Sequence, residues 1–476
     1  YHMKLAKSLL LGAAAGLATV AAASAADLPS RKSAPVEYVK VCNAYGAGFF
    51  YIPGTDTCLR VGGLVLAEAR AFWPVATTFS PNTGLPAVNK NNRDRYGSSA
   101  LGRLELDART QTGYGTLRAF ARIDSYYGTA TSAATGNLGS AGPASVTSAT
   151  ASRETTIINK AFIQFAGITA GRAQSMFDFY ADAYNWELLR GSNATTNLLA
   201  YTATFGGGFS ATLSIEDETA RRALVGGTVT GGTPALNVFD TGGTRMPDIV
   251  ANLRVDQGWG SAQLSGAVHQ ARASTVLGNM GPTDDKIGYA IQGGVKINLP
   301  MLAAGDALYL QAVYQKGASA YMNGLNIVLI EGVGADKHYG RGLARLPGSP
   351  GLTFADYDCI VNLSVGTGCQ QQKGWAITAA LQHYWTPTVS QAIYGSYMKT
   401  EYGAASLATL MTSDWKEVRV GTNLVWSPVK GFGIGAELMY AHLTQSNPFI
   451  APAYWATFQN KKEHVLETRI RVQRAF

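Results

Sequence analysis

The chain has 476 residues, of which only 15% are charged, and its formal net charge at pH 7 is +8. The charged fraction is well below the ~25% typical of soluble domains, and the basic residues are scattered singly, which argues against a nucleic-acid-binding protein. After the N-terminus no stretch approaches the ~18 uninterrupted apolar residues of a membrane helix, so the composition favours a sheet with one face in lipid and one in water.

The first 25 residues are predicted to be a secretory signal. Lys4 and Lys7 supply a positive start, residues 8–22 are apolar and rich in Leu and Ala, and small residues end at Ala25. The two residues before Met3 are interpreted as a cloning remnant. The alternative is an anchoring helix, but the apolar stretch is short and no stop-transfer charges follow it. We therefore expect the mature chain to begin near residue 26.

Four cysteines in an exported chain predict two disulfides, with three possible connectivities. Pairing of near neighbours is the simplest assignment, and it joins Cys42 to Cys58 and Cys359 to Cys369. Zinc binding is the competing interpretation, but the chain has no C-x-x-C pair to support it. We expect no metal and no cofactor.

Runs that alternate apolar and polar side chains recur from residue 59 to the end, as expected of strands with two unlike faces. In residues 101–111, Arg103 and Glu105 share one face, whereas Leu104 and Leu106 share the other. The predicted strands cover residues 59–72, 101–111, 116–124, 155–165, 168–175, 198–205, 209–216, 247–256, 261–272, 286–298, 307–316, 374–385, 390–401, 414–426, 432–443 and 464–476.

About sixteen strands of this kind predict an all-β fold, a transmembrane antiparallel β-barrel wide enough for an aqueous channel. Short turns alternate with long loops, the longest being residues 317–373, as in outer-membrane barrels. The barrel is expected to occupy residues 59–476, after an N-terminal periplasmic segment of residues 26–58. A β-propeller or large sandwich is the alternative, but no repeat of fixed period supports it. Aromatic girdles at the strand ends are expected at Tyr394, Trp415, Trp385, Trp426 and Tyr440.

One segment interrupts the alternation after the fifth strand. Residues 176–187 are aromatic and acidic, and Asp178, Asp182 and Glu187 are predicted to line a pore constriction in a loop folded into the lumen. Alternatively, these carboxylates only cap a short surface helix, and the facing arginines pair with carboxylates of the strands. The basic residues expected on the pore wall are Arg60, Arg70, Arg103, Arg109, Arg118, Arg122 and Arg172.

Residues 36–61 read VEYVKVCNAYGAGFFYIPGTDTCLRV, and this stretch resembles the N-terminal motif of the alphaproteobacterial general porins. The GRAQSMFD stretch at residues 171–178 and the closing RVQRAF are also similar to that family. The resemblance implies a homotrimer of sixteen-stranded barrels in the bacterial outer membrane, with the third loop folded into each pore. It also implies a disulfide between Cys42 and Cys58, whereas Cys359 and Cys369 lie outside the family pattern.

These observations predict a porin that conducts small polar solutes and ions passively, with membrane lipid and lipopolysaccharide as its other partners. The excess of inward arginines favours a weak preference for anions. An outer-membrane lipase is one alternative, and His383 or His442 would then serve a catalytic triad. An adhesive or structural barrel is the other. Neither is favoured, since no catalytic motif is present and a structural barrel needs no charged constriction.

Overall fold

The computed structural model describes residues 40–73, 78–79, 86–88, 96–129, 152–222, 224–228, 237–239, 243–274, 283–323, 357–362, 367–402, 414–445 and 462–476. The predicted signal and the predicted cleavage site lie outside the described residues. So does most of the loop at residues 317–373.

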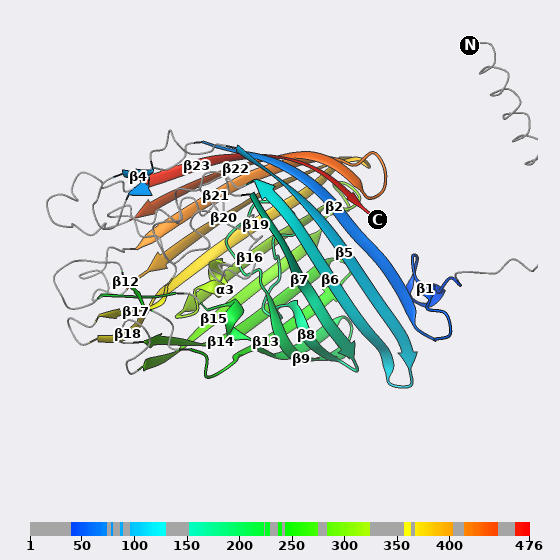
Figure 1. The fold of residues 1–476 in the computed structure, drawn as a ribbon, viewed down its shortest axis with the longest axis horizontal. Helices are drawn as coiled ribbons and strands as arrows, with labels where there is room; N and C mark the ends of the chain where they lie inside the picture. Colours follow the sequence, from blue (N-terminus) through cyan, green and yellow to red (C-terminus); the bar gives the residue numbers. More distant parts are fainter. Residues whose placement is uncertain are drawn as a thin grey trace, which may run out of the picture.

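Sixteen strands form one closed cylinder in which every neighbouring pair is antiparallel (Figure 1). The ring is closed by pairing of the first barrel strand with the last, from Leu64 opposite Ala475 to Trp73 opposite Leu466. The predicted all-β barrel and its strand number are therefore confirmed. In chain order the strands are β2 (Cys58–Trp73), β5 (Tyr96–Thr112), β6 (Gly115–Thr129), β7 (Ser152–Phe165), β8 (Ile168–Gln174), β9 (Thr195–Gly206), β10 (Phe209–Glu216), β13 (Asp248–Gln257), β14 (Gly260–Ser274), β15 (Thr283–Asn298), β16 (Ala307–Lys316), β19 (Lys373–Thr386), β20 (Val389–Glu401), β21 (Trp415–Trp426), β22 (Phe432–Gln445) and β23 (Lys462–Ala475).

The two faces of the cylinder reverse the usual distribution of side chains in a soluble protein. On β23, the outward Ile470 is 59% exposed, whereas the inward Arg469 is 1% exposed. On β10, the outward Leu213 is exposed and the inward Ser214 is buried. An apolar outside and a polar inside are stable together only when lipid contacts the outside.

A small lobe precedes the barrel and lies at the end where the short turns are found (Figure 1). It contains a 3-10 turn, η1 (Asn43–Tyr45), and a short strand, β1 (Phe50–Tyr51), which pairs with the start of β2. Phe49 packs against the disulfide between Cys42 and Cys58, and both cysteines are buried. The predicted pairing is confirmed, and it ties the lobe to the first barrel strand.

Replacing both Cys42 and Cys58 by serine is expected to destabilise this lobe by about 3 kcal/mol, because the disulfide closes a loop of moderate length. Hydrogen exchange of the amides between the two positions should measure the loss. The barrel amides serve as the internal control, since their ladder does not depend on this bond. Unchanged protection of the lobe would show that it does not need the disulfide.

The opposite end of the cylinder bears the long loops and a second, four-stranded sheet (Figure 1). This sheet consists of β11 (Leu224–Thr228), β12 (Asn237–Phe239), β17 (Tyr357–Asn362) and β18 (Thr367–Gln371). The predicted disulfide between Cys359 and Cys369 is confirmed and joins β17 to β18. Other short elements are β3 (Thr78–Phe79), β4 (Pro86–Val88), the 3-10 turn η4 (Glu218–Ala220) and α3 (Ala320–Asn323).

The helices in the described ranges are single turns, and none has the length and apolar character needed to pass through a bilayer.

The predicted aromatic girdles are confirmed only in part. Trp385, Trp426 and Tyr440 are exposed on the outer surface. The prediction was wrong for Tyr394 and Trp415, which are buried inside the cylinder. Alternation explains the error, because Ile393 points outward and its neighbour in the strand must then point inward.

Candidate functional site

A segment between β8 and β9, residues 175–194, crosses the interior of the barrel and is called here the infolded segment. It leaves and re-enters the wall at one place, where the amide of Ser175 donates to the carbonyl of Ala194 at 2.9 Å. Between these points its contacts extend to strands far along the chain. The prediction of an infolded loop after the fifth strand therefore agrees with the path of the chain.

Side-chain amides hold the first half of the infolded segment against β13, β14, β15 and β16. Asn252 donates to the carbonyl of Met176 at 2.6 Å, and Gln292 donates to the carbonyl of Phe177 at 2.8 Å. Gln311 accepts from the amide of Tyr180 at 3.0 Å. These contacts satisfy backbone groups that a non-helical segment would otherwise leave unpaired.

Charged groups hold the second half against β21, β22 and β23. Arg190 forms a two-pronged ion pair with Glu417, with both nitrogen–oxygen distances at 2.7 Å. Glu437 accepts from the amides of Trp186 at 2.7 Å and Glu187 at 2.9 Å. All these groups lie away from water, where paired charges interact more strongly than at a surface.

The three acids predicted to line the constriction occupy two kinds of environment. Asp178 pairs with Arg221 at 2.9 Å, Glu187 pairs with Arg469 at 2.5 Å, and both carboxylates are buried. Asp182 is half-exposed and accepts from amide groups of the same segment. Asp178 and Glu187 are therefore buried in ion pairs, Asp178 with the residue that follows η4 and Glu187 with β23.

The backbone of the infolded segment adopts the left-handed conformation at two residues that are not glycine. Ala181 has φ of 45° and Asp182 has φ of 57°, a conformation that costs energy for most side chains. The Asp182 carboxylate compensates by accepting from Asn185 at 2.7 Å and Asn193 at 2.8 Å. Burial raises the pKa of the neighbouring Tyr180, which keeps its hydroxyl as a donor to Asn185.

Two glycines of the wall make room for aromatic rings of the infolded segment. A Cβ added at Gly294 would lie 2.3 Å from the ring of Phe179, and one at Gly435 would lie 2.8 Å from Trp186. Both distances are shorter than any real carbon contact, so a larger residue at either position would displace the segment.

The predicted pore-wall arginines on β5 and β6 form a ladder with strand carboxylates. Each of the four arginine side chains is 21–27% exposed, whereas the side chains of Asp107 and Asp124 are buried. The pairs are Arg103 with Asp124, Arg109 and Arg118 with Asp107, and Arg122 with Glu105. The charge that this wall presents to water is therefore positive.

The other three predicted arginines do not belong to this ladder. Arg60 is exposed and lies over the ring of Phe49. Arg70 is buried beside Glu68, and Arg172 donates to the carbonyl of Ile158 at 3.0 Å. Alternation alone could not separate these environments, because it predicts only the face of a strand.

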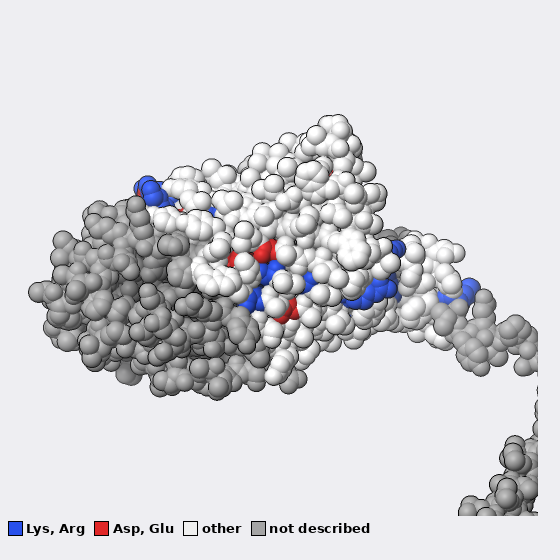
Figure 2. All heavy atoms as spheres, turned by 90° about the horizontal axis from the view of Figure 1, so that it is seen from above, with Lys and Arg blue, Asp and Glu red and all other residues white. Residues whose placement is uncertain are grey.

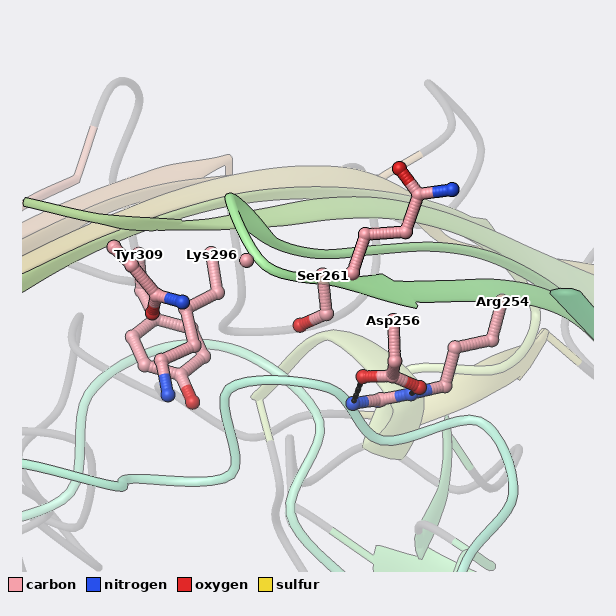
Figure 3. A pocket seen from close by; sticks show the side chains of 8 residues that line it. Arg254, Asp256, Ser261, Lys296 and Tyr309 are labelled. Carbon is pink, nitrogen blue, oxygen red and sulfur yellow. Dashed lines mark hydrogen bonds and ion pairs between the residues drawn. The ribbon is translucent and has the colours of Figure 1, made fainter. Parts of the chain in front are cut away.

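A cavity of about 390 Å³ lies near the short-turn end of β13–β16. Figure 3 shows Lys296 and Tyr309 pointing from the sheet to the same side as Ser261, while Arg254 and Asp256 pair with each other. Two distances of 2.7 Å join this ion pair. Since Asp256 neutralises Arg254, Lys296 gives the cavity a net positive charge.

Charged side chains are few on the visible outer surface. Figure 2 shows the described part of that face largely white, with a central group of basic and acidic residues and a few further basic residues toward its two ends. An outside so poor in charge agrees with contact with hydrocarbon.

The histidines considered for a lipase triad contact other groups. His383 lies 2.6 Å from Asp306, and His442 lies 3.2 Å from the hydroxyl of Thr444. His269 is fully buried inside the cylinder between two aspartates, away from the lipid-facing edge that such an enzyme requires.

Sequence reasoning missed most of the residues that hold the infolded segment. Glu417, Arg419 and Glu437 lie on inward positions of strands that were predicted correctly, so alternation placed them in the lumen. Nothing in their spacing indicates that they contact a segment more than 200 residues away.

Similar proteins are found by sequence and by structure. The family model described as "Porin subfamily" matches residues 27–468. Porin Omp2b of Brucella abortus (strain 2308) is 33% identical over 260 residues, which are 54% of this chain and 63% of that protein. Porin Omp2b of Brucella melitensis biotype 1 is 32% identical over 260 residues. The chain thus spans less than two thirds of the length of these curated relatives.

Among solved structures, the outer membrane channel DcaP of Acinetobacter baumannii superposes with a TM-score of 0.56 at 15% identity. The match covers 90% of this chain and 99% of that chain. At this identity, the likeness concerns the fold alone.

Proposed function

Because the chain belongs to the porin subfamily, we propose that this multi-pass β-barrel of the outer membrane is a passive channel for small hydrophilic solutes and ions. The observation that carries the proposal is the unequal lining of the lumen. The infolded segment is bonded to the wall from β10 to β23, whereas the arginine ladder of β5 and β6 keeps its exposure to water. The passage therefore runs between the segment and the ladder.

A constriction between these two surfaces would carry positive charge on one side and negative or neutral polar groups on the other. The ladder presents guanidinium groups, while the infolded segment presents the half-exposed Asp182 and amide groups. A transverse field of this kind orients water and polar solutes and restricts passage by size and charge. Asp178 and Glu187 contribute by fixing the position of the segment.

The exposed edges of the arginine ladder favour anions. Asp107 is shared by Arg109 and Arg118, so this group carries an excess positive charge. The cavity lined by Lys296 adds a second positively charged site along the same lumen.

The experiment that tests the channel is a planar-bilayer recording of the purified protein, in which discrete conductance steps are expected and their absence would contradict the proposal.

We expect Arg118→Gln to lower the preference for anions roughly threefold, because a unit charge contributes about 0.7 kcal/mol at ~6 Å in water. Reversal potentials in a KCl gradient measure this ratio. Lys430→Gln is the matched control, since it removes the same charge from an exposed turn outside the lumen. Equal shifts in the two variants would show that the ladder does not set the preference.

The assembly proposed is a homotrimer held in membrane lipid, with lipopolysaccharide around its outer rim. The exposed apolar belt supports contact with lipid, and the family membership supports the trimer. An image of the detergent-solubilised particle with three pores would support this trimer, and a single pore would contradict it.

We further propose that the protein performs no catalytic step, since diffusion through a water-filled passage needs none.

A further inference from the structure

A buried cluster of three potential metal ligands lies at the long-loop end of the barrel. Glu218 belongs to η4, Asp248 begins β13, and His269 lies on β14. One ligand atom of each residue lies within 4.8 Å of the other two, and all three side chains are buried. None of the three side chains belongs to the infolded segment or to the arginine ladder.

The carboxylate of Glu218 is the member of this cluster that is least satisfied by hydrogen bonds. Its residue is 1% exposed, and neither carboxylate oxygen accepts a hydrogen bond of ordinary length and angle among the described residues, although the Thr244 hydroxyl offsets part of the cost of its charge. Its nearest ion-pair partner, Arg222, is 3.7 Å away. A carboxylate buried without such a bond carries the cost of a desolvated charge. A cation between Glu218 and its neighbours would remove that cost.

The other two ligands are already oriented. His269 Nδ1 lies 2.8 Å from Asp248, and its Nε2 lies 3.3 Å from Asp358 of β17. Asp248 also accepts from the hydroxyl of Tyr321 at 2.6 Å. Partners that hold a histidine and a carboxylate in place are typical of the groups that surround metal ligands in proteins.

We propose that Glu218, Asp248 and His269 bind one divalent transition-metal ion of the Zn²⁺ class. An imidazole nitrogen with two carboxylates suits Zn²⁺, whereas Ca²⁺ and Mg²⁺ take oxygen ligands. Zn²⁺ bonds to these groups are about 2.0–2.2 Å long, so the three ligand atoms would draw together from their present spacing. Water would complete the coordination.

Such an ion would join three elements that are separate in the sequence. It would connect η4 to the start of β13 and to the second half of β14, and through the Asp358 contact it would hold β17 of the long-loop sheet. Asp358 is itself fixed by Ser319, whose amide donates to it at 2.8 Å. The ion would thus stabilise the loops at this mouth of the barrel.

The test is Zn²⁺ binding by the folded, full-length protein in detergent, stripped with EDTA and then given one equivalent of Zn²⁺. Bound metal is counted by mass spectrometry after gel filtration. One Zn²⁺ per chain is expected for the wild type, and Glu218→Gln and His269→Gln should each retain less than a tenth of it. Asp358→Asn should weaken binding by about 10–100-fold, as expected of a group that orients a ligand.

His383→Gln is the matched control, because His383 pairs with Asp306 but lacks a third ligand among the described residues. It should keep the full stoichiometry. Glu218→Gln keeps the size of the side chain and weakens only its contacts with Arg222 and Thr244, so it should fold, and circular dichroism verifies this. Absence of stoichiometric Zn²⁺ in the wild type, or equal binding by Glu218→Gln, would overturn the proposal.

Discussion

Replacing residues 176–193 by a two-residue Asn-Gly turn is expected to raise the single-channel conductance at least about twofold. A sixteen-stranded barrel without an internal segment leaves a wide aqueous channel, and the infolded segment occupies part of that space. The replacement is feasible because Ser175 and Ala194 are already hydrogen-bonded to each other at 2.9 Å. A short turn of this type joins antiparallel strands readily.

The deletion should leave the barrel folded. Wall residues such as Arg419 and Glu437 lose their contacts with the segment, but they then face water and are no longer buried. The matched control replaces Gly113 and Tyr114, which form the short turn between β5 and β6, by the same Asn-Gly pair. Planar-bilayer recordings compare the two variants. An unchanged conductance after removal of the segment would place the narrowest point elsewhere.

Arg469→Met is expected to lower the free energy of unfolding by roughly 3–5 kcal/mol, the usual cost of leaving buried charges without their partner. Arg469 lies 2.5 Å from Glu187 and 2.9 Å from Glu467, and it is also 3.5 Å from Glu68. Removing the guanidinium leaves these carboxylates repelling one another in a site closed to water. The infolded segment should detach, and channel noise should rise.

Thermal unfolding in detergent, followed by circular dichroism, measures the loss of stability. Arg474→Met is the matched control, because Arg474 lies on the same strand but donates to the carbonyl of Lys430 near the surface and pairs with no carboxylate among the described residues. A second change, Glu187→Gln in the Arg469→Met background, should restore part of the stability by removing one buried charge. If Arg469→Met and Arg474→Met unfold alike, the buried network does not hold the segment.

The barrel could be predicted from the sequence because alternation is a local property. On β10 and β16 the predicted limits coincide with the observed strands, Phe209–Glu216 and Ala307–Lys316. Each strand must bury polar groups on one side and meet lipid on the other, so its pattern is visible without knowledge of its neighbours.

The interior could not be predicted to the same depth, because it depends on contacts between distant residues. Nothing near Glu187 in the sequence indicates that it pairs with Arg469, and an acid on an infolded loop is expected to face water. The same limit applies to Tyr394, whose ring packs with Tyr180 and Leu189. The local pattern predicts which side chains of a strand point inward. Packing against a distant segment decides whether those inward side chains are buried or exposed to water.

The tether between the infolded segment and the last strand also has a kinetic consequence. Arg469 and Glu187 are separated by 282 positions in the chain, and contacts of such high sequence separation form late in folding. An intermediate in which β23 has not yet docked would lack both the last strand of the wall and this anchor, while Glu417 of β21 and Glu437 of β22 still hold the segment. Docking of β23 therefore closes the cylinder and completes the attachment of the infolded segment in one step.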